Sequence, residues 1–368
     1  MKKAVIIIPT YNEEGNVEAV VSQIIDVSKS LTNWDLHILI VDSKSKDHTS
    51  AIVKDLQKKH KNLHLLETEK EGLGKAYING FKYASQELKA YVVFEMDADL
   101  SHDPKDIPAF LKKIEEGADF VIGSRYIKGG SIPSNWAFLR KFYSVVGNLV
   151  LRLGFMKVRV TDWTSGYRAI KIWIVNSSLE HVNKYSGYVF QVALLDKAMA
   201  QHAIITELPI NFKDRVQGVS KINAKEYMSQ TLWYMFTHSS FIKFVFVGGI
   251  GFIIDFSISY VLIQKVHMKV WLATFISTES AIVANFLFNN FWSFAHKRVD
   301  NSVTAFLFGF LKFNLVSSGS VLIQTIGVGL LDAFFGQQYW YIYKIVIIAF
   351  VVIPYSYLFY NKFIWKDK

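Results

Sequence analysis

The feature that most constrains this chain is a change of composition near residue 240. From Phe241 onward the sequence consists of long apolar runs with few charged residues. A membrane-spanning helix needs about 18 to 20 mostly apolar residues. Four runs reach this length, namely Phe241–Val266, Val270–Ala295, Val303–Leu331 and Tyr339–Ile364. The sequence therefore predicts a water-exposed domain over residues 1–240 and an all-α transmembrane domain with four helices over residues 241–368.

Basic residues in the connections predict the orientation of these spans. His296-Lys297-Arg298 joins the second span to the third, and three lysines lie at or beyond the end of the fourth, whereas residues 331–339 carry no Lys or Arg. Lys265 and Lys269, after the first span, oppose this pattern. On balance the positive-inside rule places the N-terminal domain on the cytoplasmic side, and we expect an integral protein of a prokaryotic plasma membrane.

Charge and cysteine content narrow the function further. The chain has no cysteine, which excludes a disulfide scaffold and thiolate chemistry. Its net charge of +10 favours an anionic partner. No compact basic motif typical of nucleic-acid binding is present, so we expect no nucleic acid. Anionic lipid head groups of the bilayer and phosphate-bearing substrates fit better.

Residues 1–125 alternate between short apolar runs and amphipathic segments. The predicted strands are Ala4–Ile8, Leu36–Val41, Leu63–Leu66, Tyr91–Phe94 and Phe120–Ile122. The predicted helices are Asn16–Ser30, Thr49–His60, Leu73–Leu88 and Lys105–Glu115. This alternation predicts an α/β domain with a mostly parallel sheet covered on both faces. Ligands of such sheets bind at the carboxyl ends of the strands.

The predicted strand ends carry the polar residues. They are followed by Pro9-Thr10-Tyr11-Asn12-Glu13-Glu14, Asp42, Asp97-Ala98-Asp99 and Gly123-Ser124-Arg125-Tyr126. Two carboxylates two residues apart suit a divalent metal whose other ligands are phosphate oxygens and water. The alternative for this stretch is a solvated turn in which Asp103 caps the helix that starts at Pro104. Both readings remain open from this stretch alone.

Two polar clusters and two mixed segments follow. Asp162 to Arg168 is a turn-rich run whose two end residues either pair with each other or lie near a substrate, and residues 212–221 form a basic, glycine-containing loop. Residues 136–156 and 222–238 mix Arg, Lys and Tyr with Leu, Val, Phe and Trp. We expect the latter two to be amphipathic helices at a membrane interface.

Taken together, these motifs resemble a known family. They are P-T-Y-N-E (9–13), M-D-A-D-L-S-H-D-P (96–104), G-S-R-Y (123–126), D-W-T-S-G-Y-R (162–168) and D-R-V-Q-G-V-S-K (214–221). In this order they resemble the polyprenol-phosphate glycosyltransferases of glycosyltransferase family 2, nearest to the dolichol-phosphate mannose synthases. The resemblance covers Met1 to about Lys225. Asn285–Phe294 carries a weaker resemblance of the C-terminal domain to GtrA-like membrane domains.

The resemblance implies a GT-A fold, a nucleotide-sugar donor, a divalent metal (Mg²⁺ or Mn²⁺) and a polyprenyl or dolichyl phosphate acceptor. The residues it implies for the metal are Asp97, Asp99 and Ser101. For the nucleotide sugar they are Pro9, Tyr11, Asn12, Glu13, Asp42, Asp97, Ala98, Asp99, Arg215 and Lys221. Arg125 and Arg140 are expected to meet the acceptor phosphate, and Asp99, Arg125 and Arg215 to act in catalysis.

One departure from the family pattern leaves the donor open. The family usually has two acids after the second strand, whereas Ser43 follows Asp42 here. The resemblance to mannose synthases implies inverting transfer of mannose from GDP-mannose. Ser43 and the GtrA-like domain keep glucose from UDP-glucose as the alternative. A non-catalytic transporter of lipid-linked sugar is a less favoured hypothesis because the acidic and basic motifs are intact. A processive polysaccharide synthase is disfavoured because its Q-x-x-R-W signature is missing.

Overall fold

The computed structural model describes residues 1–214, 224–300 and 302–366. It divides the chain into two units, Met1–Tyr234 and Met235–Lys368, which are described separately. The predicted basic residues Arg215 and Lys221 lie outside the described residues.

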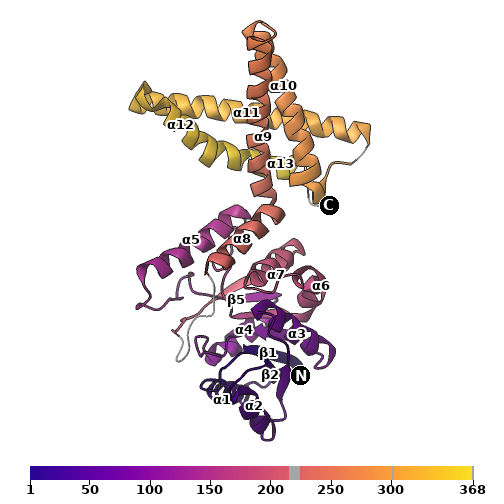
Figure 1. Cartoon of the computed structure of the whole chain (residues 1–368), viewed down its shortest axis with the longest axis vertical. Helices are drawn as coiled ribbons and strands as arrows, with labels where there is room; N and C mark the ends of the chain where they lie inside the picture. Colours follow the sequence, from indigo (N-terminus) through magenta and orange to yellow (C-terminus); the bar gives the residue numbers. More distant parts are fainter. Residues whose placement is uncertain (215–223, 301, 367–368) are drawn as a thin grey trace. The chain divides into compact units, whose positions relative to one another are not determined.

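A mixed β-sheet forms the centre of the first unit (Figure 1). Over the described residues its order is β3-β2-β1-β4-β6-β5-β7. The strands are β1 (Lys2–Thr10), β2 (Trp34–Asp42), β3 (Leu63–Glu67), β4 (Val92–Glu95), β5 (Phe120–Ser124), β6 (Arg168–Lys171) and β7 (Ile205–Pro209). β6 pairs antiparallel with β4 and β5, and the remaining pairs are parallel. The predicted α/β class with a mostly parallel sheet is confirmed.

Helices cover both faces of this sheet, as the buried apolar strands require. The helices from α1 to α8 are α1 (Val17–Ser28), α2 (Thr49–Gln57), α3 (Leu73–Gln86), α4 (Ile107–Glu115), α5 (Phe138–Gly154), α6 (Ile172–Val182), α7 (Val189–Ala200) and α8 (Ala224–His238). α1 to α4 and α6 pack on strands of the sheet. Successive side chains of a strand point to opposite faces. In β1, Ala4, Ile6 and Ile8 share a core with residues of α1 and α4. Ile7 points the other way, against α3, where a Cβ at Gly80 would come within 2.6 Å of its side chain.

Two strands and two helices were missed by the sequence pattern. β6 has four residues and begins with the fully buried Arg168, so it lacks the apolar alternation of a strand. β7 lies at the sheet edge and carries Glu207 among half-buried residues. The helices α6 and α7 fall between the motifs on which the sequence interpretation was based.

The second unit contains four helical segments, counted over the described residues, that are long and apolar enough to cross a membrane. They are Ser240–Gln264, Val270–Ser293, Val303–Phe335 and Ile342–Phe363. The helices are α9 (Ser240–Gln264), α10 (Val270–Phe288), α11 (Val303–Phe335), α12 (Trp340–Ile347) and α13 (Ile353–Phe363). The prediction of four apolar helical segments is confirmed, and the third extends four residues beyond its predicted end at Leu331.

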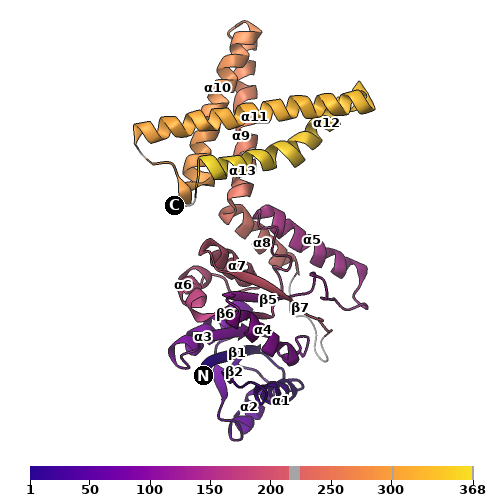
Figure 2. The same cartoon turned by 180° about the vertical axis from the view of Figure 1, so that it is seen from behind.

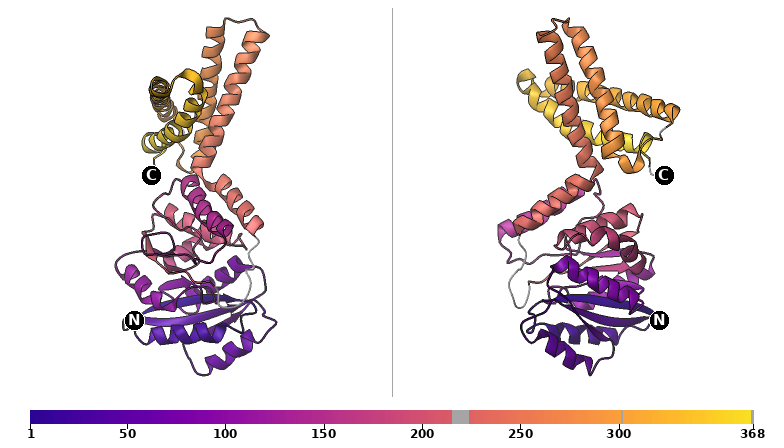
Figure 3. Two further views of the ribbon diagram at one scale, coloured as in Figure 1. Left: turned by 90° about the vertical axis from the view of Figure 1, so that its left-hand side faces the viewer. Right: turned by 45° about the vertical axis from the view of Figure 1, so that its right-hand side comes forward.

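Within this unit the helices pack in pairs. α9 and α10 lie side by side along their length (Figure 3). The segment that contains α12 and α13 returns along α11 (Figure 2). Stacked rings close one end, with Phe294 and Trp365 centred 4.4 Å apart and Phe313 and Tyr360 4.5 Å apart.

Candidate active site

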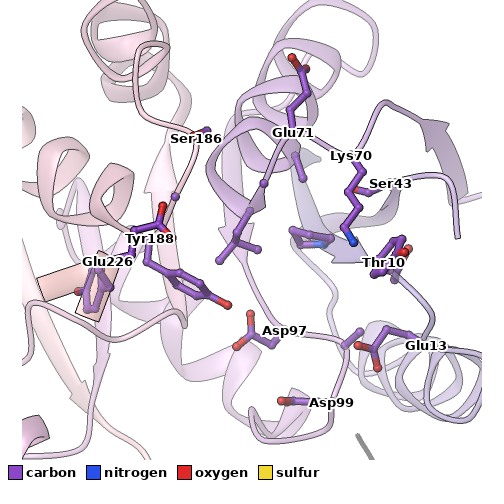
Figure 4. Close-up of a pocket in the computed structure, with 18 of the residues that line it drawn as sticks. Thr10, Glu13, Ser43, Lys70, Glu71, Asp97, Asp99, Ser186, Tyr188 and Glu226 are labelled. Carbon is purple, nitrogen blue, oxygen red and sulfur yellow. The ribbon is translucent and has the colours of Figure 1, made fainter. Parts of the chain in front are cut away.

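A cavity of about 440 Å³ lies in the first unit at the carboxyl ends of the parallel strands. Pro9 and Thr10 line it from the end of β1, Ser43 from the end of β2, and Asp97 and Asp99 from the turn after β4. Figure 4 shows these side chains around one opening, with Asp97 between the side that carries Lys70 and the side that carries Glu226. The structure thus places the cavity at the sheet edge where the sequence predicts a ligand.

The acidic turn that follows β4 is held by hydrogen bonds to its own neighbours. The Ser101 amide donates to Asp99 Oδ1 over 3.1 Å, and Leu100 has a positive φ of 62°. Ala98, also predicted for the nucleotide-sugar site, lines the cavity between the two aspartates. Both carboxylates are therefore aimed at the opening by a fixed backbone.

His102 supports this turn from beneath. Its Nδ1 lies 3.1 Å from the Asp97 amide nitrogen, and its ring stacks on Tyr167 with centroids 4.9 Å apart. Burial lowers the pKa of His102 to about 4 against the opposing effect of Asp99. The imidazole is therefore neutral at neutral pH and accepts the amide proton at Nδ1.

The donor atoms of this turn fit a divalent cation that shares its coordination with a substrate. Over the described ranges, no three His, Cys, Asp or Glu side chains meet as a self-sufficient metal site. Mg²⁺ and Mn²⁺ commonly take one or two protein carboxylates and complete their shell with phosphate oxygens and water. Asp97 and Asp99 provide the carboxylates. Ser101 Oγ is buried and has no hydrogen-bond partner within the described part of the chain, although Ser101 does not line the cavity.

Asp103 forms the predicted cap behind this turn. Its Oδ1 accepts the Lys105 amide over 3.0 Å, and Pro104 occupies the first helical position before α4. The capped turn that the sequence offered as the alternative is thus formed by Asp103 and Pro104, while the carboxylates considered for a metal are those of Asp97 and Asp99.

One side of the cavity is formed by the loop after β1 and the segment before α3. Tyr11 and Glu13 line it from the first, and Lys70 from the second. Lys70 Nζ lies 3.6 Å from the centroid of the Tyr11 ring. An aromatic face beside a cation suits a nucleobase and its phosphates.

Asn12 and Asp42, both predicted for the nucleotide-sugar site, do not line this cavity. Asn12 Oδ1 accepts a hydrogen bond from the backbone amide of Lys46, and the backbone amide of Asn12 donates one to Ser45 Oγ. The Asp42 carboxylate is 1% exposed and accepts hydrogen bonds from Thr10 Oγ1, from Ser45 Oγ and from the Ser45 amide. The structure thus gives both residues a role in joining two loops, and the neighbouring Ser43 faces the cavity instead.

Arg125 forms a buried ion pair with Asp162. Its Nε and Nη2 each lie 2.7 Å from a carboxylate oxygen, and the Arg125 amide donates to the same carboxylate. Thr164 Oγ1 accepts a further bond from Nη2. The arginine side chain is 9% exposed and does not line the cavity. The guanidinium predicted to meet a phosphate is therefore committed to the polypeptide in this structure.

The pairing considered for Asp162 and Arg168 is wrong. Arg168 is fully buried and donates to the carbonyl oxygens of Trp163 and Gln191, with Nε 3.8 Å from Glu95. Burial raises the pKa of Glu95 to about 7 against the effect of Arg168. Arg168 thus fixes β6 and α7 behind the acidic turn.

Arg140 lies on the first turn of α5, and it does not line the cavity. Its guanidinium carbon is 3.8 Å from the centroid of a Trp136 ring, and Nη1 is 3.4 Å from Asp214. About half of its side chain is exposed. The structure therefore keeps Arg140 accessible beside the start of the basic motif.

The sequence interpretation missed eight of the residues that line the cavity. Three of them are Glu71, Ser186 and Gly187, and the other five are Lys70, Tyr188, Glu226, Tyr227 and Gln230. Lys70 precedes a glycine-rich turn, a weak signal by itself. The last four of these five come from the start of α7 and from α8, which the sequence predicts only as an interfacial helix. Their spacing gave no signal, because a polar pair four residues apart occurs on most exposed helix faces.

Two family models match the chain. One is the model of glycosyl transferase family 2, over residues 5–178. The other is the model of the GtrA/DPMS transmembrane domain, over residues 243–365.

Similar proteins are found among characterised sequences and solved structures. A dolichol-phosphate mannosyltransferase of Pyrococcus furiosus is 32% identical over 328 residues, which is 87% of this chain and 88% of the relative. A polyprenol monophosphomannose synthase of Mycolicibacterium smegmatis is 35% identical over 60% of this chain and 82% of the relative. Glucosyl-3-phosphoglycerate synthase from Mycobacterium tuberculosis, solved with Mn²⁺, uridine diphosphate and its product, aligns with a TM-score of 0.46 at 17% identity, covering 65% of this chain and 80% of that one.

Proposed function

The chain belongs to glycosyl transferase family 2 and ends in a GtrA/DPMS transmembrane domain, and from this we propose that it transfers mannose to a polyprenyl phosphate. Family membership confirms the resemblance drawn from the five motifs, and the protein is a glycosyltransferase with a GT-A domain. One observation carries the proposal. The similarity to the Pyrococcus furiosus dolichol-phosphate mannosyltransferase extends over 87% of the chain, so it reaches into both units.

The proposed donor is GDP-mannose. Its base and ribose would occupy the side of the cavity formed by Pro9, Tyr11, Glu13 and Lys70. UDP-glucose remains the alternative, because Ser43 stands at the cavity where the family usually has a second acid. A serine hydroxyl both donates and accepts, so it suits either base.

Asp97 and Asp99 would hold Mg²⁺ or Mn²⁺ together with the donor diphosphate, with Ser101 Oγ as a further oxygen behind them. When bound, the metal neutralises charge on the diphosphate as it leaves. The fixed turn keeps both carboxylates in place before the donor arrives, and such preorganisation contributes most to charge stabilisation in catalysis.

The proposed reaction is a direct displacement with inversion at the anomeric carbon. An oxygen of the lipid phosphate forms the new bond to carbon 1 while the bond to the diphosphate breaks, and its electron pair leaves with the nucleoside diphosphate. A phosphate monoester has a second pKa of about 6, so it is an anion near neutral pH and needs no strong base. We therefore assign Asp99 to binding and orientation rather than to proton removal.

The chain's cations would hold the two anionic substrates near each other. Arg215 and Lys221, assigned to the donor diphosphate by their motif, lie outside the described residues. Arg140 is accessible for the acceptor phosphate. Arg125 would act on the acceptor only if its pair with Asp162 opened, so we assign it to positioning the turn that contains Asp162.

The lipid acceptor would reach the first unit along α5. This helix exposes an apolar stripe made of Phe138, Leu139, Phe142, Val145, Leu149 and Leu153. Its polar positions carry Arg140, Lys141 and Arg152. Such a helix is typical of a membrane interface. The basic connections of the spans support a catalytic unit on the cytoplasmic side of the membrane. The membrane that we propose is the plasma membrane of a prokaryote.

Membranes that contain the full chain provide the test. They are supplied with Mg²⁺ or Mn²⁺, a polyprenyl phosphate and radiolabelled GDP-mannose or UDP-glucose. We expect label from GDP-mannose to enter an organic-extractable lipid that releases mannose in mild acid. If label enters the lipid from UDP-glucose alone, the protein is the alternative glucosyltransferase. Label entering from neither donor would contradict the proposed function.

A further inference from the structure

The wall of the cavity opposite Lys70 is built by α8 and by the turn before α7. Glu226, Tyr227 and Gln230 line the cavity from α8, and Tyr188 lines it from the turn. Figure 4 shows the Tyr188 side chain reaching toward Asp97 from the side on which Glu226 lies. A ligand held at Asp97 would therefore lie between the side of the cavity that carries Lys70 and Tyr11 and the wall that carries Glu226 and Tyr188.

The chemistry of this wall differs from that of the nucleotide side. Among the described residues that line the cavity, Lys70 is the one Lys or Arg, and it lies beside Tyr11. The α8 wall presents a carboxylate, a carboxamide and two phenol rings. A carboxylate repels a phosphate but accepts hydrogen bonds from two hydroxyl groups. The wall is thus suited to a polyhydroxylated, uncharged group.

The polar groups on this wall are held in relation to each other. Glu226 and Gln230 lie four residues apart on one helix face, and Gln230 Nε2 donates to Glu226 Oε1 over 3.0 Å. This bond turns the Gln230 carbonyl oxygen toward the adjacent turn, where a Cβ at Gly187 would come within 3.0 Å of it. The turn itself is anchored to α3, because the Gly74 amide donates to the Ser186 carbonyl over 2.7 Å.

Aromatic rings complete the wall. Tyr188 and Tyr227 are in edge contact, with centroids 5.9 Å apart and planes at 66°. Phenol rings provide an apolar face for the C–H groups of a pyranose and a hydroxyl for its oxygens. A hexose can therefore form hydrogen bonds with the carboxylate and the carboxamide of this wall and pack its C–H groups on the aromatic rings.

We propose that Glu226 and Gln230 bind the hydroxyl groups of the donor hexose and are specificity-determining residues of this transferase. The inference rests on the proposed function and deepens it, because it assigns the sugar to α8 while the base and diphosphate lie toward Lys70 and the acidic turn. A site built to hydrogen-bond a substrate hydroxyl discriminates strongly against a substrate that places it differently. Mannose and glucose differ in the configuration of one hydroxyl, so the α8 wall would distinguish them.

Binding to the purified full chain separates the sugar from the nucleotide. The ligands are GDP, GDP-mannose and GDP-glucose, each with Mg²⁺, and the variants are Glu226→Gln and Gln230→Ala. Ser229→Ala, also exposed on α8 but absent from the cavity lining, is the matched control. We expect each wall variant to bind GDP-mannose about 10- to 100-fold more weakly, as expected for a lost hydrogen bond to a charged or polar partner. GDP affinity should be unchanged, and the preference for one hexose over the other should fall.

The outcomes distinguish this inference from the proposed function. If the unmodified chain binds the nucleotide sugars and both wall variants match it, the hexose lies elsewhere and the inference is wrong. An equal loss of GDP affinity in the wall variants would also overturn it, since it would place the effect on the nucleotide or on the fold. If the unmodified chain binds neither GDP-mannose nor GDP-glucose, the proposed function fails first and the inference fails with it.

Discussion

Arg125 and Asp162 form a bidentate ion pair that joins the end of β5 to the turn before β6, with the carboxylate fully buried and the guanidinium nearly so. Asp162 is fixed further because its own amide donates to Glu207 Oε1 on β7 over 3.0 Å. The pair raises the pKa of the Arg125 guanidinium against the lowering effect of burial. Two family motifs that are nearly forty residues apart in sequence therefore act as one structural element.

Asp162→Asn should destabilise the first unit by about 3–5 kcal/mol, because it leaves the Arg125 charge buried without its counterion. Thermal unfolding of the detergent-solubilised chain would measure the effect. Asp26→Asn is the matched control, since Asp26 pairs with Lys29 on the surface and should change stability by about 0–1 kcal/mol. Equal stability changes in the two variants would show that the buried pair is not a structural requirement.

Asp97→Asn and Asp99→Asn should each lower transfer by at least about 10²-fold, the scale seen when a preorganised charge-stabilising group is lost. The physical reason is the loss of carboxylate charge opposite the donor diphosphate. Rates would be measured over a range of Mn²⁺ concentrations with unfolding followed in parallel.

Asp103→Ala is the control on the same stretch. It removes the cap that Asp103 provides for the following helix and should cost about 0.5–2 kcal/mol of stability with transfer retained. A similar loss of transfer in all three variants would place the effect on the fold of the turn rather than on the carboxylates at the cavity.

Lys70→Gln should raise the donor KM about tenfold with a smaller change in kcat, because a charge-assisted contact to the nucleotide is replaced by a neutral one. Lys44→Gln is the control, since Lys44 pairs with Glu69 nearby and does not line the cavity. Steady-state kinetics with varied donor would separate the two constants. An unchanged donor KM would remove Lys70 from the nucleotide site.

The strands, the spans and the acidic turn were predictable because each is encoded locally. Five short apolar runs between Ala4 and Ile122 are recognisable as strands, and four long apolar segments as membrane-spanning helices, from periodicity and length alone. The carboxyl-edge rule then placed Pro9, Tyr11 and Asp97 around one opening without any knowledge of side-chain contacts.

The misses have a common physical origin in tertiary contacts. Asp42 is the last residue of β2, at the sheet edge where the rule places ligands. Its carboxylate instead accepts hydrogen bonds from Thr10 and Ser45, and nothing in the local sequence indicates those partners. Glu226 reaches the cavity from a helix about 130 residues beyond the acidic turn. Such placements depend on how the chain returns to the sheet, which periodicity does not encode.

Asp196 on α7 should make stability depend on pH. Burial raises the pKa of this carboxyl from 3.8 to about 6, against the effect of the hydrogen bond from Tyr234. Between these values the folded state binds more protons than the unfolded state, so stability falls as pH rises from about 4 to 6. Asp196→Asn keeps an acceptor for Tyr234 without this charge. Its melting temperature should exceed that of the unmodified chain above pH 6, by a few degrees, and converge with it near pH 4. A constant difference across this range would show that Asp196 is not the titrating group.

The apolar stripe of α5 should govern use of the lipid acceptor rather than of the donor. Phe142, which is 48% exposed, lies at the centre of the stripe, and Phe142→Ser removes apolar surface that would enter the membrane interface. At about 25 cal/mol per Å², loss of most of a phenyl ring's contact amounts to about 1–3 kcal/mol, so the KM for a long polyprenyl phosphate should rise about 5- to 150-fold. The donor KM should not change, and a short water-soluble isoprenyl phosphate should be used equally well by both proteins. A matched loss with the short acceptor would place Phe142 in the structure of the first unit instead of at the bilayer.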